Sequence, residues 1–138
     1  MSAVLNCNIS FIGGGNMAQA LIGGLLSRGM PATRITVADP VEKIRQVLLE
    51  KELHVTDDNT AAIESADVVV FAVKPQVLAS VLKPLHNKLQ GKLVISIVAG
   101  AEIDSIAYLL GTDQIVRVMP NTPALVQTGA HGMYATAA

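Results

Sequence analysis

The sequence predicts an α/β fold in which helices cover both faces of a doubly wound, parallel β-sheet. Short apolar runs alternate along the chain with segments that carry the 3.6-residue period of an amphipathic helix. The runs VVVFAV and LVISIV are almost continuously apolar, which is typical of strands that are buried on both faces. Because the connections are short, we expect right-handed crossovers in an open sheet.

The expected strands occupy residues 9–12, 34–38, 68–73, 93–98 and 115–119, and a further short strand is expected around 132–135. The first helix carries one apolar stripe, formed by Ala18, Leu21, Ile22, Leu25 and Leu26. Gly29 and Pro31 follow this stripe, which is the usual pattern at a helix end. Further helices are expected at 41–51, 75–87 and 102–110, with a short one at 59–65.

The composition favours a single soluble domain. Although 51% of the 138 residues are hydrophobic, no window approaches the ~18 uninterrupted apolar residues of a membrane-spanning helix, and the N-terminus does not resemble a secretory signal. The net charge of −1 and the 3% aromatic content give no support to nucleic-acid binding. The single cysteine, Cys7, excludes an internal disulfide and fits a reducing compartment.

The unusual residues all follow predicted strands. Gly13, Gly14 and Gly15 follow the first strand, Asp39 the second, Lys74 and Pro75 the third, Ala99 and Gly100 the fourth, and Asn121 the fifth. In a doubly wound sheet, ligands bind outside the carboxyl ends of the strands. The sequence therefore predicts a binding site along one edge of the sheet.

The turn after the first strand has the pattern G-x-G-x-x-A, formed by Gly13, Gly15 and Ala18. Gly13 permits a tight turn, Gly15 lets a pyrophosphate approach the backbone at the helix N-terminus, and Ala18 keeps the helix close to the sheet. A flexible turn without a ligand is the alternative. Since a strand precedes the turn and an amphipathic helix follows it, we predict a Rossmann-type domain that binds a dinucleotide.

Asp39 occupies the place where an acid accepts hydrogen bonds from the adenosine ribose, which favours NAD over NADP. Lys43 and Arg45 follow within two helical turns and could reach a 2′-phosphate instead. Asp39 could also cap the helix that follows Pro40. The sequence leaves the choice between NADP(H) and NAD(H) open.

Other chemistry is not indicated. Lys74 could equally serve a ligand or be an ordinary lysine at the sheet edge. The histidines at 54, 86 and 131 have no spacing suited to a metal site, so no metal is expected. No catalytic acid can be assigned, and the catalytic residues stay unknown.

The segments FIGGGNMAQALIGGLL, VVFAVKPQ, LVISIVAG and VRVMPNTPALVQTG together resemble the N-terminal half of pyrroline-5-carboxylate reductase. The similarity runs from about residue 9 to residue 129, and the motifs A-V-K-P-Q and M-P-N-T-P-A are much more specific than the glycine pattern. The resemblance implies NAD(P)H-dependent reduction of 1-pyrroline-5-carboxylate to L-proline, the last step of proline biosynthesis, in the cytoplasm. It also implies the roles of individual residues.

By this resemblance, Gly13, Gly15, Asn16 and Met17 hold the pyrophosphate, and Asp39 and Asn59 lie on the adenosine side. Residues 72–75, which are Ala72, Val73, Lys74 and Pro75, line the cofactor groove. Ala99 and Gly100 lie near the nicotinamide ribose, and Met119, Pro120 and Asn121 flank the nicotinamide.

The family's proteins are about twice as long as this chain and carry a helical C-terminal domain that makes the dimer and completes the substrate pocket. We therefore expect residues 1–138 to be one NAD(P)-binding domain, with 126–138 as its truncated tail. Alone, the chain is expected to be inactive; the full-length protein is expected to form a homo-oligomer. The alternatives are another small dehydrogenase or imine reductase with this type of domain, or a non-catalytic nucleotide-binding module.

Overall fold

The computed structural model describes residues 7–119 and the backbone of residues 132–135. Its strands are β1 (Ile9–Ile12), β2 (Ile35–Ala38), β3 (His54–Thr56), β4 (Val68–Phe71), β5 (Leu93–Ser96), β6 (Ile115–Met119) and β7 (Gly132–Ala135). Its α-helices are α2 (Asn16–Ser27), α3 (Glu42–Leu49), α4 (Asn59–Ile63), α5 (Pro75–Leu82) and α6 (Ile103–Leu110). Two 3₁₀ turns, η1 (Ala32–Arg34) and η2 (Lys83–Leu85), complete the order.

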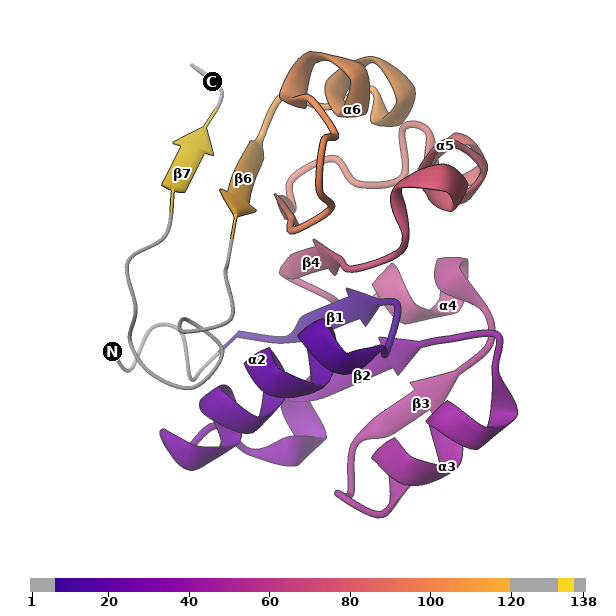
Figure 1. The fold of residues 1–138 in the computed structure, drawn as a ribbon, viewed down its shortest axis with the longest axis vertical. Helices are drawn as coiled ribbons and strands as arrows, with labels where there is room; N and C mark the ends of the chain where they lie inside the picture. The colour runs from indigo at the N-terminus through magenta and orange to yellow at the C-terminus, as the bar shows by residue number, and fades with distance from the viewer. Residues whose placement is uncertain (1–6, 120–131, 136–138) are drawn as a thin grey trace.

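The strands form one sheet in the order β3-β2-β1-β4-β5-β6-β7 (Figure 1). The first six are parallel, and β7 pairs antiparallel with β6. The first strand, β1, lies inside the sheet; β2 and β3 follow outward on one side of it, and the chain then crosses back to place β4 on the other side of β1. The strand order therefore reverses between β1 and β4, the position where ligands bind in folds of this class.

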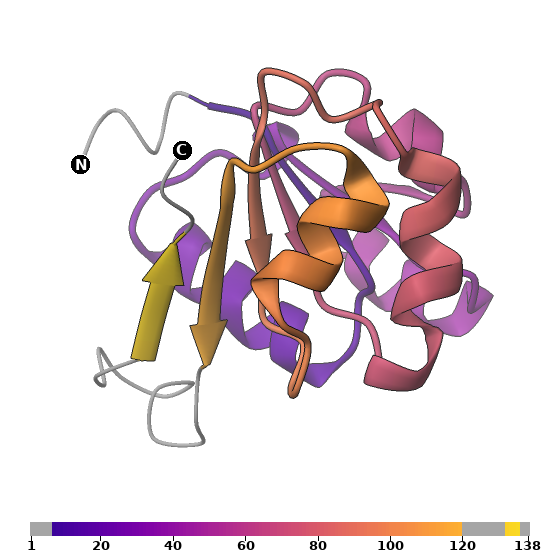
Figure 2. The same cartoon turned by 90° about the horizontal axis from the view of Figure 1, so that it is seen from above.

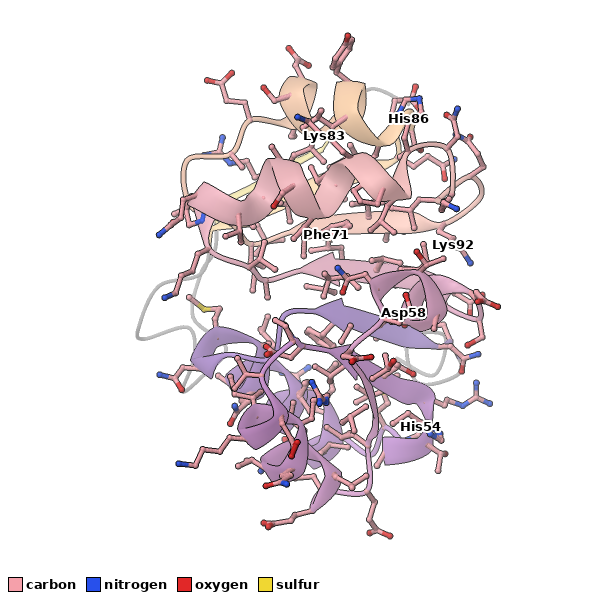
Figure 3. The ribbon with its side chains drawn as sticks, turned by 90° about the vertical axis from the view of Figure 1, so that its right-hand side faces the viewer. His54, Asp58, Phe71, Lys83, His86 and Lys92 are labelled. Carbon is pink, nitrogen blue, oxygen red and sulfur yellow. The ribbon has the colours of Figure 1, made fainter. Side chains whose placement is uncertain are left out.

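Helices cover the two faces of the sheet separately. Helices α4, α5 and α6 contribute apolar side chains to the core on one face, where Phe71 lies with Leu78 and Ile106. Helices α2 and α3 cover the other face, where Phe11 lies with Ile22 and Leu48. Figure 2 shows α5 and α6 side by side on their face of the sheet, and Figure 3 labels Phe71 beneath α5. The predicted doubly wound, Rossmann-type α/β fold is confirmed.

Three local features differ from the sequence expectation. The strand β3 was not predicted, because its three residues at the sheet edge carry no buried apolar run. The helix expected at 75–87 ends at Leu82 and continues as the 3₁₀ turn η2, where Pro84 has no N–H to donate. The strand expected around 132–135 is present as β7, but it runs against the other strands.

Candidate functional site

The candidate site lies along the carboxyl edge of the sheet, where backbone hydrogen bonds continue past the strand ends. The N–H of Gly13 donates to the carbonyl of Ala38 at 2.8 Å, and the N–H of Ala72 donates to Ile12 at 2.8 Å. The N–H of Asp39 donates to the carbonyl of Thr56 at 3.0 Å. These bonds fix the first residue after each of three neighbouring strands, so the loops leave the sheet from defined positions.

Gly13 makes the turn out of β1 and cannot carry a side chain. Its φ of +105° lies in a region that favours glycine. A Cβ atom added there would lie 2.6 Å from the carbonyl oxygen of Ala72 and 3.2 Å from Cγ1 of Val73. The turn after β1 therefore packs directly against the end of β4, at the point where the strand order reverses.

Gly14 lies against the opposite neighbour, helix α3. A Cβ atom there would lie 2.8 Å from Cδ1 of Leu48 and 3.0 Å from Cγ1 of Val37. The N–H of Gly14 donates to Oδ2 of Asp39 at 2.9 Å, and its carbonyl accepts from Nε2 of Gln19 at 2.8 Å. Packing and hydrogen bonds together hold Gly14 and the peptide groups on both sides of it in one orientation.

Gly15 faces open space and caps helix α2. A Cβ atom at this position would meet no protein atom within 4 Å. Its φ of −74° is open to every residue type, so neither strain nor protein packing demands a glycine. No side chain caps the helix, whose first N–H groups, from Asn16 and Met17 onward, have no partner within the helix. The geometry is that of a helix N-terminus open to an anion.

Asp39 is buried, with 7% of its surface exposed, and it connects the glycine turn to the start of α3. While Oδ2 accepts from Gly14, Oδ1 accepts from the N–H of Val41 at 2.8 Å. The carbonyl of Asp39 accepts from Nη1 of Arg45 at 2.8 Å. The guanidinium of Arg45 is thereby held at the end of β2, while Lys43 is exposed. The sequence also allowed Asp39 to cap the helix that follows Pro40. The bond from the N–H of Val41 is a local contact of that kind, although α3 begins at Glu42 and no side chain caps its first turn.

The other predicted residues are distributed along the same edge. Asn59 is half-buried at the start of α4, and it lines a shallow pocket of about 380 Å³ together with Ser80 and Val81. Lys74 and Pro75 are exposed at the start of α5. Ala99 and Gly100 are exposed after β5. Asn121 and Pro120 lie outside the described residues, as does most of the expected tail at 126–138.

Two contributors to the turn were not anticipated from the sequence. Gln19 closes the turn from inside α2 through its bond to the Gly14 carbonyl. A glutamine in the first turn of a helix that follows a glycine turn is a usable signal, because it can reach back to the preceding backbone. The packing of Gly14 against Leu48 has no signal in the sequence, since it depends on a tertiary contact.

Within residues 7–119 and 132–135, no group of three or more His, Cys, Asp or Glu side chains could hold a metal ion. None of the helices described here has the length and apolar character needed to cross a bilayer.

The fold and the glycine turn at its reversal point define a dinucleotide-binding domain of the Rossmann class. A family model described as "NADP oxidoreductase coenzyme F420-dependent" matches residues 8–100, more than half of the chain. The chain belongs to this family.

Curated relatives confirm the resemblance noted from the motifs. The pyrroline-5-carboxylate reductase of Pasteurella multocida is 49% identical over 134 residues, which cover 93% of this chain and 49% of the relative. The enzyme of the same name from Pseudomonas aeruginosa is 45% identical over 132 residues, which cover 48% of that enzyme. The chain therefore spans about half the length of the curated relatives it matches.

Solved structures agree. A pyrroline-5-carboxylate reductase from Coxiella burnetii matches 95% of this chain with a TM-score of 0.89 and 41% identity. A pyrroline carboxylate reductase from Plasmodium falciparum, solved with NADP bound, matches 96% of this chain with a TM-score of 0.82 and 30% identity. The match covers 50% of the first structure and 49% of the second.

Proposed function

We propose that this chain is the cofactor-binding domain of an NAD(P)H-dependent pyrroline-5-carboxylate reductase, which reduces 1-pyrroline-5-carboxylate to L-proline. The observation that carries the proposal is the open space at Gly15 in front of helix α2. No protein atom uses the room that the missing side chain leaves, whereas Gly13 and Gly14 are packed against protein. A pyrophosphate fits this room, because it needs close approach to unpaired backbone N–H groups.

The remaining predicted residues receive their roles within this proposal. Asn16 and Met17 extend the phosphate site along the first turn of α2, and Asp39 and Asn59 lie on the adenosine side. Residues 72–75 (Ala72, Val73, Lys74 and Pro75) line the groove beside the glycine turn. Ala99 and Gly100 lie toward the nicotinamide, and the resemblance assigns Asn121, which is outside the described residues, to the same end of the cofactor. These assignments follow the resemblance and, for the residues that the structure describes, their position along one edge of the sheet.

The proposed reaction needs little acid–base catalysis from the protein. The nicotinamide, when bound, supplies a hydride to the carbon of a cyclic imine, which is a good electrophile once protonated. The protein's main tasks are to hold the two reactants in line and to exclude water. This chain's residues bind and orient the dinucleotide, and no residue of the chain is assigned as the proton donor.

The proposal extends to the rest of the protein. We propose that residues 1–138 form one domain, that a second, helical domain completes the substrate pocket, and that the full-length protein is a cytoplasmic homo-oligomer. The chain covers about half of its relatives, which supports a further region in the full-length protein. The helical character of that region, the homo-oligomer and the cytoplasmic location follow from the resemblance alone.

The first test is a titration of the purified chain into NADPH and, separately, into NADH, followed by nicotinamide fluorescence. The absence of tryptophan keeps the background low. We expect saturable binding of at least one nucleotide. No binding of either nucleotide by a chain shown to be folded would contradict the proposal for this domain.

The second test addresses the reaction. The full-length protein that contains this domain should oxidise NADPH or NADH in the presence of 1-pyrroline-5-carboxylate. Turnover of a 3-hydroxy acid or of unrelated imines alone would favour the dehydrogenase or imine-reductase alternative. Nucleotide binding without turnover of any of these substrates would favour a non-catalytic module.

A further inference from the structure

We propose that Asp39 is a positioning residue that holds the glycine turn in its phosphate-binding shape before any nucleotide binds. The inference deepens the proposed function and rests on it, because it assigns the turn to phosphate. It differs from the expectation that Asp39 serves mainly as a ligand of the adenosine ribose. If Asp39 is a positioning residue, removing its carboxylate disturbs the phosphate site at the glycine turn. If it is a ribose ligand, removing the carboxylate disturbs only the adenosine side.

The carboxylate of Asp39 is engaged by protein on both oxygens. Oδ2 accepts the N–H of Gly14 at 2.9 Å and Oδ1 accepts the N–H of Val41 at 2.8 Å. Gly14 and Asp39 are 25 positions apart in the chain, so this bond joins the turn after β1 to the start of α3. Asp39 is a buried residue, 7% exposed, and each of its carboxylate oxygens already accepts a backbone N–H.

The position of Gly14 makes this bond effective. A Cβ atom on Gly14 would lie 2.8 Å from Cδ1 of Leu48, so the residue lies close to α3, and its carbonyl accepts from Nε2 of Gln19. The N–H of Gly14, in the peptide group before its Cα, is bound by Asp39, while its carbonyl, in the peptide group after its Cα, is bound by Gln19. With both polar groups of Gly14 occupied, the next residues, Gly15 and the start of α2, carry the N–H groups left for a ligand.

Charge and positioning predict opposite effects when the carboxylate is neutralised. By charge alone, a carboxylate beside the turn repels a pyrophosphate, so its removal should tighten anion binding. If Asp39 positions the turn, its removal should weaken anion binding, because the N–H groups lose their common direction. An isosteric Asn can accept only one of the two N–H groups with its single carbonyl oxygen.

The test uses inorganic pyrophosphate, which binds a phosphate site and has no ribose, together with NADPH and NADH. Affinities are measured for the wild-type chain, for Asp39→Asn and for the control Glu42→Gln. Glu42 is an exposed acid in the first turn of α3, so the control makes the same change of charge near the same edge. For Asp39→Asn we expect about tenfold weaker binding of all three ligands, as for a lost hydrogen bond to a charged group, with an unchanged ratio between NADPH and NADH.

Two results would overturn the proposal. One is pyrophosphate binding to Asp39→Asn that is as tight as, or tighter than, binding to wild type. The other is a loss confined to NADH with a gain for NADPH, which is the signature of a ribose ligand. For Glu42→Gln we expect unchanged or slightly tighter binding of each ligand, and a tenfold loss there would also overturn the proposal.

A second measurement needs no ligand. In the free wild-type chain, amide exchange followed by NMR should show the N–H of Gly14 protected, and Asp39→Asn should exchange it at least about tenfold faster. Unprotected exchange in wild type, or equal protection in the variant, would overturn the proposal. If the variant fails to fold, the wild-type result still decides. If wild type binds no nucleotide, the proposed function fails, while Gly14 exchange separately reports on the Asp39 contact.

Discussion

Gly13 and Ala72 lie so close that a Cβ atom on Gly13 would be 2.6 Å from the Ala72 carbonyl oxygen. The contact joins the loops that follow β1 and β4, the two strands between which the strand order reverses. Because the obstructing atom belongs to the backbone, next to the end of β4, it cannot move aside as a flexible side chain would. The glycine turn is thus part of the fold as well as part of the candidate site.

Gly13→Ala is expected to lower the free energy of unfolding by about 2–5 kcal/mol, because it combines a positive φ with a steric overlap. Gly29→Ala is the matched control, since Gly29 has a φ of +98° but open space around a Cβ. The control should lose only about 1–2 kcal/mol. Urea unfolding measures both, and equal losses would show that the Ala72 contact contributes nothing.

Gly15→Val is expected to weaken NADPH binding by at least about tenfold while the chain stays folded, since the added side chain fills the ligand's space. The stability cost should be that of a poorer N-cap, about 1 kcal/mol. Gly24→Ala, in the exposed interior of α2, serves as the control. It should stabilise the helix by about 0.5–1 kcal/mol and leave the NADPH affinity unchanged. Unaltered NADPH binding by Gly15→Val would show that the pyrophosphate does not bind at this position.

Lys74→Met tests whether the exposed lysine at the start of α5 contacts the cofactor. We expect about three- to tenfold weaker NADPH binding and a smaller dependence of affinity on salt, as for a lost ammonium–phosphate contact. Lys83→Met removes an exposed lysine from η2 (labelled in Figure 3) and should leave binding unchanged. Equal affinities of the two variants would identify Lys74 as an ordinary lysine at the sheet edge.

Asp58→Ala tests the local stability of the adenosine side. Oδ1 of Asp58 (labelled in Figure 3) accepts from the N–H groups of Thr60 and Ala61 and so caps α4. Its loss should cost about 1 kcal/mol in thermal or urea unfolding. Asp57→Ala removes the neighbouring exposed acid and should change stability by less than about 0.5 kcal/mol. A larger loss for Asp57→Ala than for Asp58→Ala would contradict the capping assignment.

The central part of the fold could be predicted because its strands are apolar throughout. All of β1, and Val69 to Phe71 in β4, are buried. Such burial requires continuous apolar runs, which polar loops do not have. The edge strand β3 left no such pattern, since pairing with β2 on one side only does not require continuous apolar residues. The direction of β7 could not be predicted from the sequence either, because a short strand can pair parallel or antiparallel with its neighbour.

The candidate site was predictable in position but not in its internal contacts. Residues that follow parallel strands must meet at one edge, so Asp39 was expected on the same edge as the glycines. Which atoms its carboxylate would engage did not follow, because Gly14 and Asp39 are 25 positions apart in the chain and their contact depends on tertiary packing. Hydrogen bonds between segments that are distant in sequence depend on side-chain packing that no local pattern records.

The open space at Gly15 has a practical consequence for protein engineering. Of the three consecutive glycines, only this one can accept a side chain without displacing protein atoms. A larger side chain at position 15 could therefore be combined with a cofactor analogue that has a smaller group beside its phosphates. Such a domain would bind the analogue and would no longer bind the natural nucleotide. Saturation libraries for such an orthogonal pair should vary position 15 and keep positions 13 and 14 constant.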